Sequence, residues 1–204
     1  MTNFIADYFL YFANPATILA FFIAGYCLSS RKYCVQFAAL CSLDILVNTS
    51  LKGFFTSPLA GFMHHKGYVF PSGHTQFATV FYGYIAFFGL PEQLKKSQFI
   101  ALNYLEERLI ISSILIIGVG YGLIHYHYHN LEDVIAGFLV GLGLVFVYQL
   151  SLLRFCKTMP LILFITASLL LFINFLLYKD ILDYVWTAYS ALCILLLAQT
   201  LSRD

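Results

Sequence analysis

All six histidines fall in two short stretches of the chain. His64, His65 and His74 make up the first, and His125, His127 and His129 the second. Lys52 and Lys66 accompany the first stretch. Ionisable groups at the edge of a membrane mark functional sites by default. The clustering therefore predicts one polar site built from two distant parts of the sequence.

The first stretch ends in Phe70-Pro71-Ser72-Gly73-His74-Thr75, directly before an apolar run. Pro and Ser suit the first positions of a helix, and Gly allows a ligand to approach the backbone. The unpaired N–H groups of a helix start bind anions. His74 would lie at the mouth of such a site and could donate a proton.

The second stretch continues into Asn130-Leu131-Glu132-Asp133. His129 and Asp133 are four residues apart, so in the first turn of a helix they share a face. The carboxylate of Asp133 can then hold one ring nitrogen of His129 and turn the other towards a substrate.

The order and spacing of these motifs resemble the type 2 phosphatidic acid phosphatase superfamily. That family carries K-x6-R-P, then P-S-G-H, then S-R-x5-H-x3-D, in a membrane protein of several helices. The resemblance spans residues 52–133. It implies that His129 is the nucleophile forming a phosphohistidine, that Asp133 orients it, and that His74 protonates the leaving oxygen.

By the same resemblance, Ser72, the backbone of Gly73 and Lys52 bind the phosphate oxygens, and no metal or other cofactor is needed. Such a site works by positioning and electrostatic stabilisation of the transferring phosphoryl group.

Both arginines of the family pattern are missing. The first-motif Arg-Pro aligns with Leu59-Ala60, and the third-motif Ser-Arg aligns with Gly122-Leu123. Arginine holds a phosphate bidentately, which lysine does less well. We therefore expect either weak activity or a clamp rebuilt from Lys66, His65, His125 and His127, among which Lys66 and His125 are the predicted substitutes.

The elements that must position these residues follow from composition. The chain has 204 residues, of which 61% are hydrophobic and 10% charged, against roughly a quarter charged in soluble domains. The sequence predicts an all-α polytopic transmembrane bundle of about six or seven helices, forming a single integral-membrane domain over 1–204. Seven runs approach the roughly 20 residues that cross a membrane: 8–29, 33–51, 75–91, 108–126, 133–153, 159–178 and 181–201.

Two features refine this prediction. Asn14-Pro15 interrupts the first run, so residues 1–13 could lie along the membrane interface. The last two runs are separated only by Lys179-Asp180, which predicts a C-terminal helical hairpin over 159–201.

Lysine and arginine accumulate on the cytoplasmic side of membrane proteins. Eight lie on one predicted side (Arg31, Lys32, Lys95, Lys96, Arg108, Arg154, Lys157, Arg203) and three on the other (Lys52, Lys66, Lys179). Residues 52–74 and 127–132 should therefore face outwards, which for a bacterial inner membrane is the periplasmic side.

Asp44, Asn48 and Lys52 lie at i, i+4 and i+8 and form a polar stripe on one helix. Two interpretations stay open: an internal structural pairing, or support of Lys52 at the site. The glycines at 118, 120 and 122, like those at 137, 141 and 143, favour close helix packing.

The sequence is therefore interpreted as an integral-membrane lipid phosphate or pyrophosphate phosphatase. The best substrate candidates are a polyprenyl (undecaprenyl) pyrophosphate and a phosphatidate-type lipid. The alternatives are a phosphotransferase of the same family, a non-catalytic lipid-phosphate binder, and a zinc site on His125, His127 and His129 with His64 and His65. A net charge of +1 gives no support for nucleic-acid binding, and the expected partners are the lipid substrate and the bilayer.

Overall fold

A computed structural model describes residues 2–28, 31–57, 68–88, 98–178 and 181–201. Helices account for nearly all of these ranges, as the composition predicts. They are α1 (Thr2–Tyr11), α2 (Pro15–Leu28), α3 (Arg31–Phe55), α4 (Gly73–Phe88), α5 (Gln98–His125), α6 (Leu131–Arg154), α7 (Met159–Tyr178) and α8 (Asp183–Leu201).

Four of the described helices are long and apolar enough to cross a membrane: Tyr33–Phe55, Leu105–His125, Leu131–Arg154 and Met159–Tyr178. A fifth span is possible if the bent pair Asn3–Tyr11 and Pro15–Ile23 counts as one. Many large apolar side chains on α5, α6 and α7 are exposed, for example Ile117, Leu150 and Leu161. Such exposure is expected where lipid replaces water. The prediction of an all-α polytopic bundle is confirmed.

The predicted break in the first apolar run is confirmed. α1 ends at Tyr11, α2 begins at Pro15, and the two helices are bent by 45°. The Oδ1 atom of Asn14 accepts a hydrogen bond from the amide of Ala16 at 2.9 Å. An Asn cap followed by Pro is a typical helix start.

One predicted run was too short. The run at 108–126 belongs to α5, which begins ten residues earlier, at Gln98. The sequence from Gln98 to Glu107 contains several polar residues that lower its hydropathy. Leu, Ala, Gln and Glu are nevertheless good helix formers, so the backbone stays helical beyond the apolar run.

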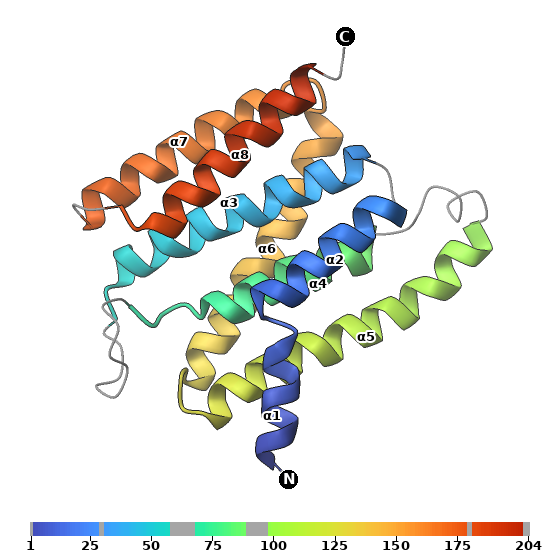
Figure 1. Ribbon diagram of the computed structural model, residues 1–204, viewed down its shortest axis with the longest axis vertical. Helices are drawn as coiled ribbons and strands as arrows, with labels where there is room; N and C mark the ends of the chain where they lie inside the picture. The colour runs from blue at the N-terminus through green and yellow to red at the C-terminus, as the bar shows by residue number, and fades with distance from the viewer. Residues whose placement is uncertain (1, 29–30, 58–67, 89–97, 179–180, 202–204) are drawn as a thin grey trace.

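The helices form layers in which α4 lies near the centre (Figure 1). α7 and α8 pack against α3, α3 packs against α4, and α4 packs against both α5 and α6. α1 packs against α5 on the far side. The core between α3 and α4 is aromatic: the rings of Phe37 and Tyr84 stack at 5.1 Å, and Phe81 lies 4.9 Å from Phe37.

Glycines bring α6 against the start of α4. A Cβ on Gly137 would lie 2.5 Å from the carbonyl oxygen of Ser72, and one on Gly141 would lie 2.6 Å from that of Gln76. Larger residues would push the two helices apart, so these two glycines fix α6 against the P-S-G-H segment. A Cβ added to Gly143 would meet nothing within 4 Å, so Gly143 is not the helix-packing position that the sequence suggested.

Two glycines of α5 receive α1 in a similar way. Added Cβ atoms on Gly118 and Gly122 would collide with Phe9 and Leu10 respectively. α1 therefore lies directly on α5 rather than apart from the bundle, and its first turns reach the end of α5.

Candidate active site

The site lies where four helix ends meet at one end of the bundle. The C-terminal turn of α3 carries Lys52, and the N-terminus of α4 follows Ser72. The turn between α5 and α6 carries His129, and the first turn of α6 carries Asp133. These residues span 82 positions of sequence, yet the helix packing brings them together.

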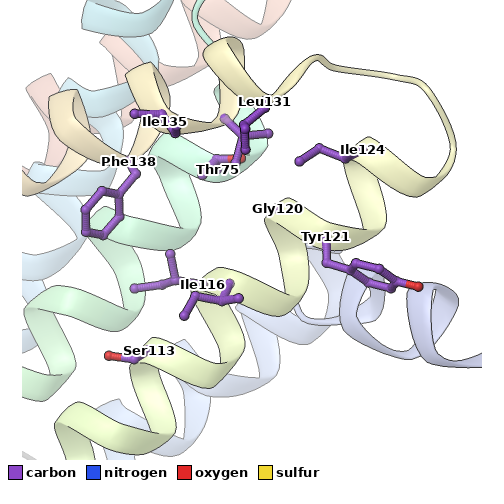
Figure 2. Close-up of a pocket in the computed structure, with 11 residues that line it drawn as sticks. Thr75, Ser113, Ile116, Gly120, Tyr121, Ile124, Leu131, Ile135 and Phe138 are labelled. Atoms are coloured by element: carbon purple, nitrogen blue, oxygen red, sulfur yellow. The ribbon is translucent and has the colours of Figure 1, made fainter.

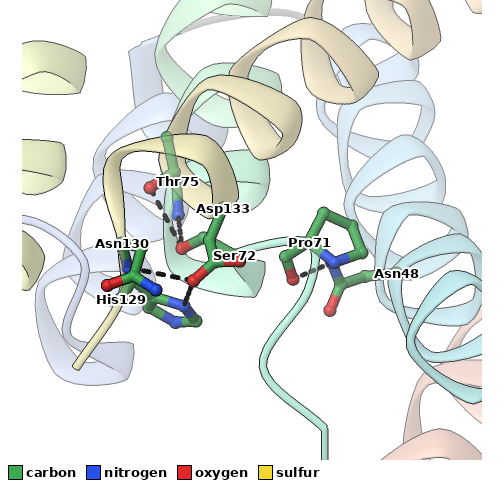
Figure 3. A network of polar contacts seen from close by, with 7 residues as sticks. All are labelled: Asn48, Pro71, Ser72, Thr75, His129, Asn130 and Asp133. Carbon is green, nitrogen blue, oxygen red and sulfur yellow. Dashed lines mark hydrogen bonds and ion pairs between the residues drawn. The ribbon is translucent and has the colours of Figure 1, made fainter. Parts of the chain in front are cut away.

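The P-S-G-H segment is held by hydrogen bonds on both sides of Ser72 (Figure 3). The hydroxyl of Ser72 lies 3.1 Å from that of Thr75 and accepts a hydrogen bond from the Thr75 amide at 3.4 Å. The Ser72 amide donates to the backbone carbonyl of Asp133 at 3.1 Å. Ser72 thus caps α4 and also ties this segment to α6.

The turn that carries His129 is tight. His127 has φ 57°, in the left-handed region, and its amide donates to the carbonyl of Ile124 at 3.0 Å. The amide of Tyr128 donates to the carbonyl of Leu123 at 2.9 Å. The turn closes on α6, where the Asn130 amide donates to Oδ2 of Asp133 at 2.9 Å.

Asp133 also faces His129, as their spacing predicts. The Nδ1 atom of His129 lies 3.5 Å from Oδ2 of Asp133, and both side chains are almost buried. No described residue gives this Nδ1 an ordinary hydrogen bond. In substrate-free sites such contacts are often long and tighten on binding.

The surroundings keep His129 uncharged. Burial, followed in size by the positive charge of Lys52, lowers the pKa of His129 to about 4. Asp133 acts in the opposite direction without cancelling these two effects. The imidazole is therefore neutral at neutral pH, which is the form that can act as a nucleophile.

Lys52 and His74 lie on facing helices beside Gly73. A Cβ on Gly73 would lie 2.8 Å from Oδ1 of Asn48 and 3.7 Å from Nζ of Lys52, so only glycine allows this approach. Part of the His74 side chain is exposed at the surface. Protein atoms nevertheless surround most of its imidazole and keep water away from it. That burial, and then the charge of Lys52, lowers the pKa of His74.

A cleft of about 540 Å³ opens beside these groups. Lys52, Gly73 and His74 line it, together with Asp44 and Asn48 of α3. The rest of its wall is mostly apolar and comes from the turn before α2 and from α2, α3, α4 and α8: Ala13, Pro15, Ile18, Leu19, Phe22, Ile45, Thr49, Phe77 and Tyr184.

A second hollow of about 490 Å³ lies on the other side of α4, between α5 and α6 (Figure 2). Its wall contains the hydroxyl-bearing residues Thr75, Ser113 and Tyr121, and the other residues that line it are apolar side chains and Gly120. Of the P-S-G-H-T segment, only Thr75 reaches this hollow. The cationic groups of the site line the first cleft instead.

The chain also matches the PAP2 superfamily over residues 33–155, from α3 to the end of α6. The chain belongs to the PAP2 superfamily. The fold is similar to that of a transmembrane PAP2-type phosphatidylglycerolphosphate phosphatase from Bacillus subtilis, with a TM-score of 0.63 and 21% identity. That alignment covers 76% of this chain and 78% of the other. No curated protein matches the chain significantly.

The structure brings together most of the residues that the PAP2 motifs single out. Lys52, Ser72, Gly73, His74, His129 and Asp133 all lie at the same end of the bundle. Lys66, like Leu59-Ala60, lies outside the described residues, so its role as a phosphate ligand stays a prediction.

The position of the missing third-motif arginine is filled by the core. Leu123 is 2% exposed, and its carbonyl accepts the hydrogen bond from Tyr128 described above. His125, the predicted substitute, has its Nε2 3.0 Å from Oδ1 of Asn3 in α1. Its neighbour Tyr126 donates to Asp7 of the same helix. Contact of His125 with phosphate stays a prediction.

Sequence reasoning missed Gln76 as a member of the site. It is fully buried and hydrogen-bonded to two residues of the polar stripe on α3. A lone glutamine four residues after Ser72, in an apolar run opposite Asp44 and Asn48, was the available signal. For the zinc alternative, the described residues hold no group of three or more His, Cys, Asp or Glu suited to a metal ion.

Proposed function

We propose that this protein is a membrane phosphatase that hydrolyses lipid phosphates or pyrophosphates through a phosphohistidine on His129. One observation carries the proposal: Lys52 and His74 line a cleft whose other walls are mostly apolar. A lipid phosphate has the same division into an anionic head and a hydrocarbon chain. PAP2 membership supports phosphatase activity.

In the proposed reaction, Nε2 of His129 attacks phosphorus, because Nδ1 faces Asp133. A P–N bond forms while the P–O bond to the leaving group breaks, and His74 donates a proton to the leaving oxygen. The leaving group is the lipid alcohol for a monophosphate and the lipid monophosphate for a pyrophosphate. Water then attacks phosphorus, with His74 taking up its proton, and the P–N bond breaks to release phosphate and restore His129. Asp133 stabilises the positive charge that develops on the His129 ring. No metal takes part in this scheme.

The phosphate oxygens would be bound by Lys52, by the hydroxyl of Ser72 and by the backbone N–H of Gly73 at the start of α4. In the transition state, the negative charge is spread over the three equatorial oxygens that these groups would face. Lys66 and His125 are proposed to add the positive charge that the missing arginines supply elsewhere in the family.

The preferred substrates are a polyprenyl pyrophosphate, such as the undecaprenyl carrier, and phosphatidate-type lipids, including phosphatidylglycerophosphate. The site is proposed to face outwards from a bacterial inner membrane, where a carrier lipid would be recycled. The Bacillus subtilis relative in fold is itself described as a phosphatidylglycerolphosphate phosphatase.

Two other functions remain as alternatives. A phosphotransferase would pass the phosphoryl group from His129 to a second lipid instead of water. A non-catalytic lipid-phosphate binder is favoured by the buried Leu123 at the motif arginine position, because a binder needs no clamp for the transition state.

The test is phosphate release by the purified protein from undecaprenyl pyrophosphate, phosphatidate and phosphatidylglycerophosphate, with and without a chelator. We expect release in chelator, its loss in His129→Ala, and a fall of about 10²–10⁴-fold in His74→Ala. His127→Asn is the matched control. It lies two residues from His129, is exposed, and has a left-handed backbone that asparagine tolerates.

Wild-type-like release from His129→Ala would exclude the phosphohistidine. The metal site would be favoured instead if a chelator abolished phosphate release, added zinc restored it, and His127→Asn also abolished it. Transfer of labelled phosphate to added lipid would identify a phosphotransferase. Binding of these lipids without any release would identify a non-catalytic binder.

A further inference from the structure

A carboxyl group is buried in the middle of α3, within a candidate membrane span. Asp44 is 1% exposed. A buried acid of this kind is costly unless another polar group satisfies it. Its partner is Gln76 of α4, which is fully buried. The Nε2 atom of Gln76 donates to Oδ1 of Asp44 at 2.7 Å and approaches the Asp44 backbone carbonyl at 3.4 Å.

The other end of the Gln76 amide continues the chain. Its Oε1 accepts a hydrogen bond from Nδ2 of Asn48 at 2.9 Å. The same Nδ2 lies 3.5 Å from the carbonyl of Pro71, at the start of the P-S-G-H segment. Figure 3 shows this last contact. Three buried or half-buried side chains thus link the centre of α3 to the segment that holds Ser72, Gly73 and His74.

Asp44 determines which way both amides point. Its Oδ1 accepts the hydrogen bond from Nε2 of Gln76, so the NH₂ group of that amide faces the carboxyl group. The carbonyl of Gln76 then faces Asn48, whose NH₂ group donates. This turns Oδ1 of Asn48 towards Gly73, where an added Cβ would lie only 2.8 Å away.

The same residues are tied to the backbone of the segment. The amide of Gln76 donates to the carbonyl of Ser72 at 3.0 Å, in the first turn of α4. Lys52 follows Asn48 by one turn of α3, with its Nζ 3.7 Å from the Cβ position of Gly73. The network therefore sets the distance between Lys52 on one helix and Gly73 and His74 on the other.

We infer that Asp44, Gln76 and Asn48 are positioning residues for phosphoryl transfer, acting through the P-S-G-H segment. This inference rests on the proposed function. Misplacement of reacting groups by about 1 Å can cost about 10²-fold in rate. Of the two interpretations that the sequence left open for Asp44, the bond to Gln76 is the internal pairing, and support of Lys52 stays a prediction.

The test measures kcat and KM of purified Asp44→Leu, Gln76→Leu and the double variant, with Asp44→Asn as the conservative change. We expect each Leu variant to lower kcat by about 10²-fold with little change in KM. The double variant should be no worse than either single one, because both break the same chain. Asp44→Asn keeps an acceptor oxygen and should retain most of the turnover.

Asn174→Leu is the matched control. Asn174 of α7 is also 1% exposed and donates to Ser50 of α3 at 2.8 Å, but it does not line the cleft. It should lose thermal stability and keep kcat. A fall in kcat equal to that of Asp44→Leu would mean that any lost polar contact on α3 suffices, and would overturn the inference.

Hydrogen exchange of residues 71–77, followed by mass spectrometry, gives a readout that needs no turnover. Asp44→Leu should speed exchange there and Asn174→Leu should not. Unchanged exchange in Asp44→Leu overturns the inference, even if the wild-type protein proves inactive. An inactive wild-type protein by itself overturns only the proposed function. If Asp44→Leu does not accumulate, Gln76→Met breaks the same chain with little change in volume.

Discussion

At the residue scale, the charge of Lys52 has two effects on the site. It is proposed to attract the phosphate, and it also lowers the pKa of the nearby His129, in the same direction as burial does. A neutral histidine is the form that attacks phosphorus. In the proposed mechanism, the same cation would both bind the substrate and keep the His129 nucleophile unprotonated.

This predicts the acid side of the pH profile. His129 loses activity when it is protonated, so kcat/KM should fall only as the pH drops towards its pKa of about 4. An unperturbed histidine would place that fall near 6.5. Lys52→Met removes one of the effects that lower this pKa, the others being burial and His74, so the midpoint should move to higher pH, whatever the loss in rate.

The profile of kcat/KM between pH 3.5 and 8, measured with one substrate for both proteins, checks the prediction. Because both proteins are measured with the same substrate, the ionisation of that substrate contributes equally to both profiles. The second ionisation of a phosphate monoester falls at about pH 6 and is the same for both proteins. No shift of the midpoint in Lys52→Met would therefore contradict the prediction.

At the element scale, α2 forms one wall of the cleft and α5 and α6 form the second hollow. Only the first is lined by Lys52 and His74. The lipid chain should therefore lie along α2 rather than between α5 and α6. The bend at Asn14-Pro15 is what carries α2 across the cleft while α1 turns away onto α5.

Filling the cleft or the second hollow with a large side chain shows which of the two spaces holds the lipid chain. Ile18→Trp, in the cleft, should raise KM for long-chain lipid phosphates about tenfold, equivalent to losing contact with about two methylene groups at roughly 0.8 kcal/mol each. It should leave KM for a short-chain, water-soluble phosphate unchanged. Ile135→Trp, in the second hollow, is the matched control and should change neither. The opposite pattern would assign the chain to the space between α5 and α6.

At the scale of the whole molecule, the site gathers at one end of the bundle and most described basic residues lie towards the other. The ends of α3 and α5 meet the starts of α4 and α6 at the site, whereas Arg154 ends α6 at its far end and Lys157 follows it. With the positive-inside rule, this arrangement predicts that the site faces away from the cytoplasm.

Cysteine labelling in intact cells checks this orientation. In a chain that keeps only the exposed Cys156, an impermeant maleimide should react only after the cells are opened. In a cysteine-free chain carrying Tyr128→Cys, at a position 44% exposed in the turn beside His129, it should react without opening. The reverse result would mean that the site is cytoplasmic.

The sequence by itself determined the membrane class, most helix ends and the His129–Asp133 pair. Each of these depends on residues close in sequence. An apolar run must become a helix in lipid whatever it packs against, and a spacing of four places two side chains on one helix face. The order of the motifs was sufficient to identify the family.

Only the tertiary structure decided how the two halves of the site meet. The bond between Gln76 and Asp44 joins residues 32 apart, and that between His125 and Asn3 joins residues 122 apart. Gly137 could be assigned to Ser72 only once α6 was seen to cross the start of α4. Such contacts depend on which helices become neighbours, and in a chain whose helices are nearly all apolar, hydropathy does not distinguish one neighbour from another.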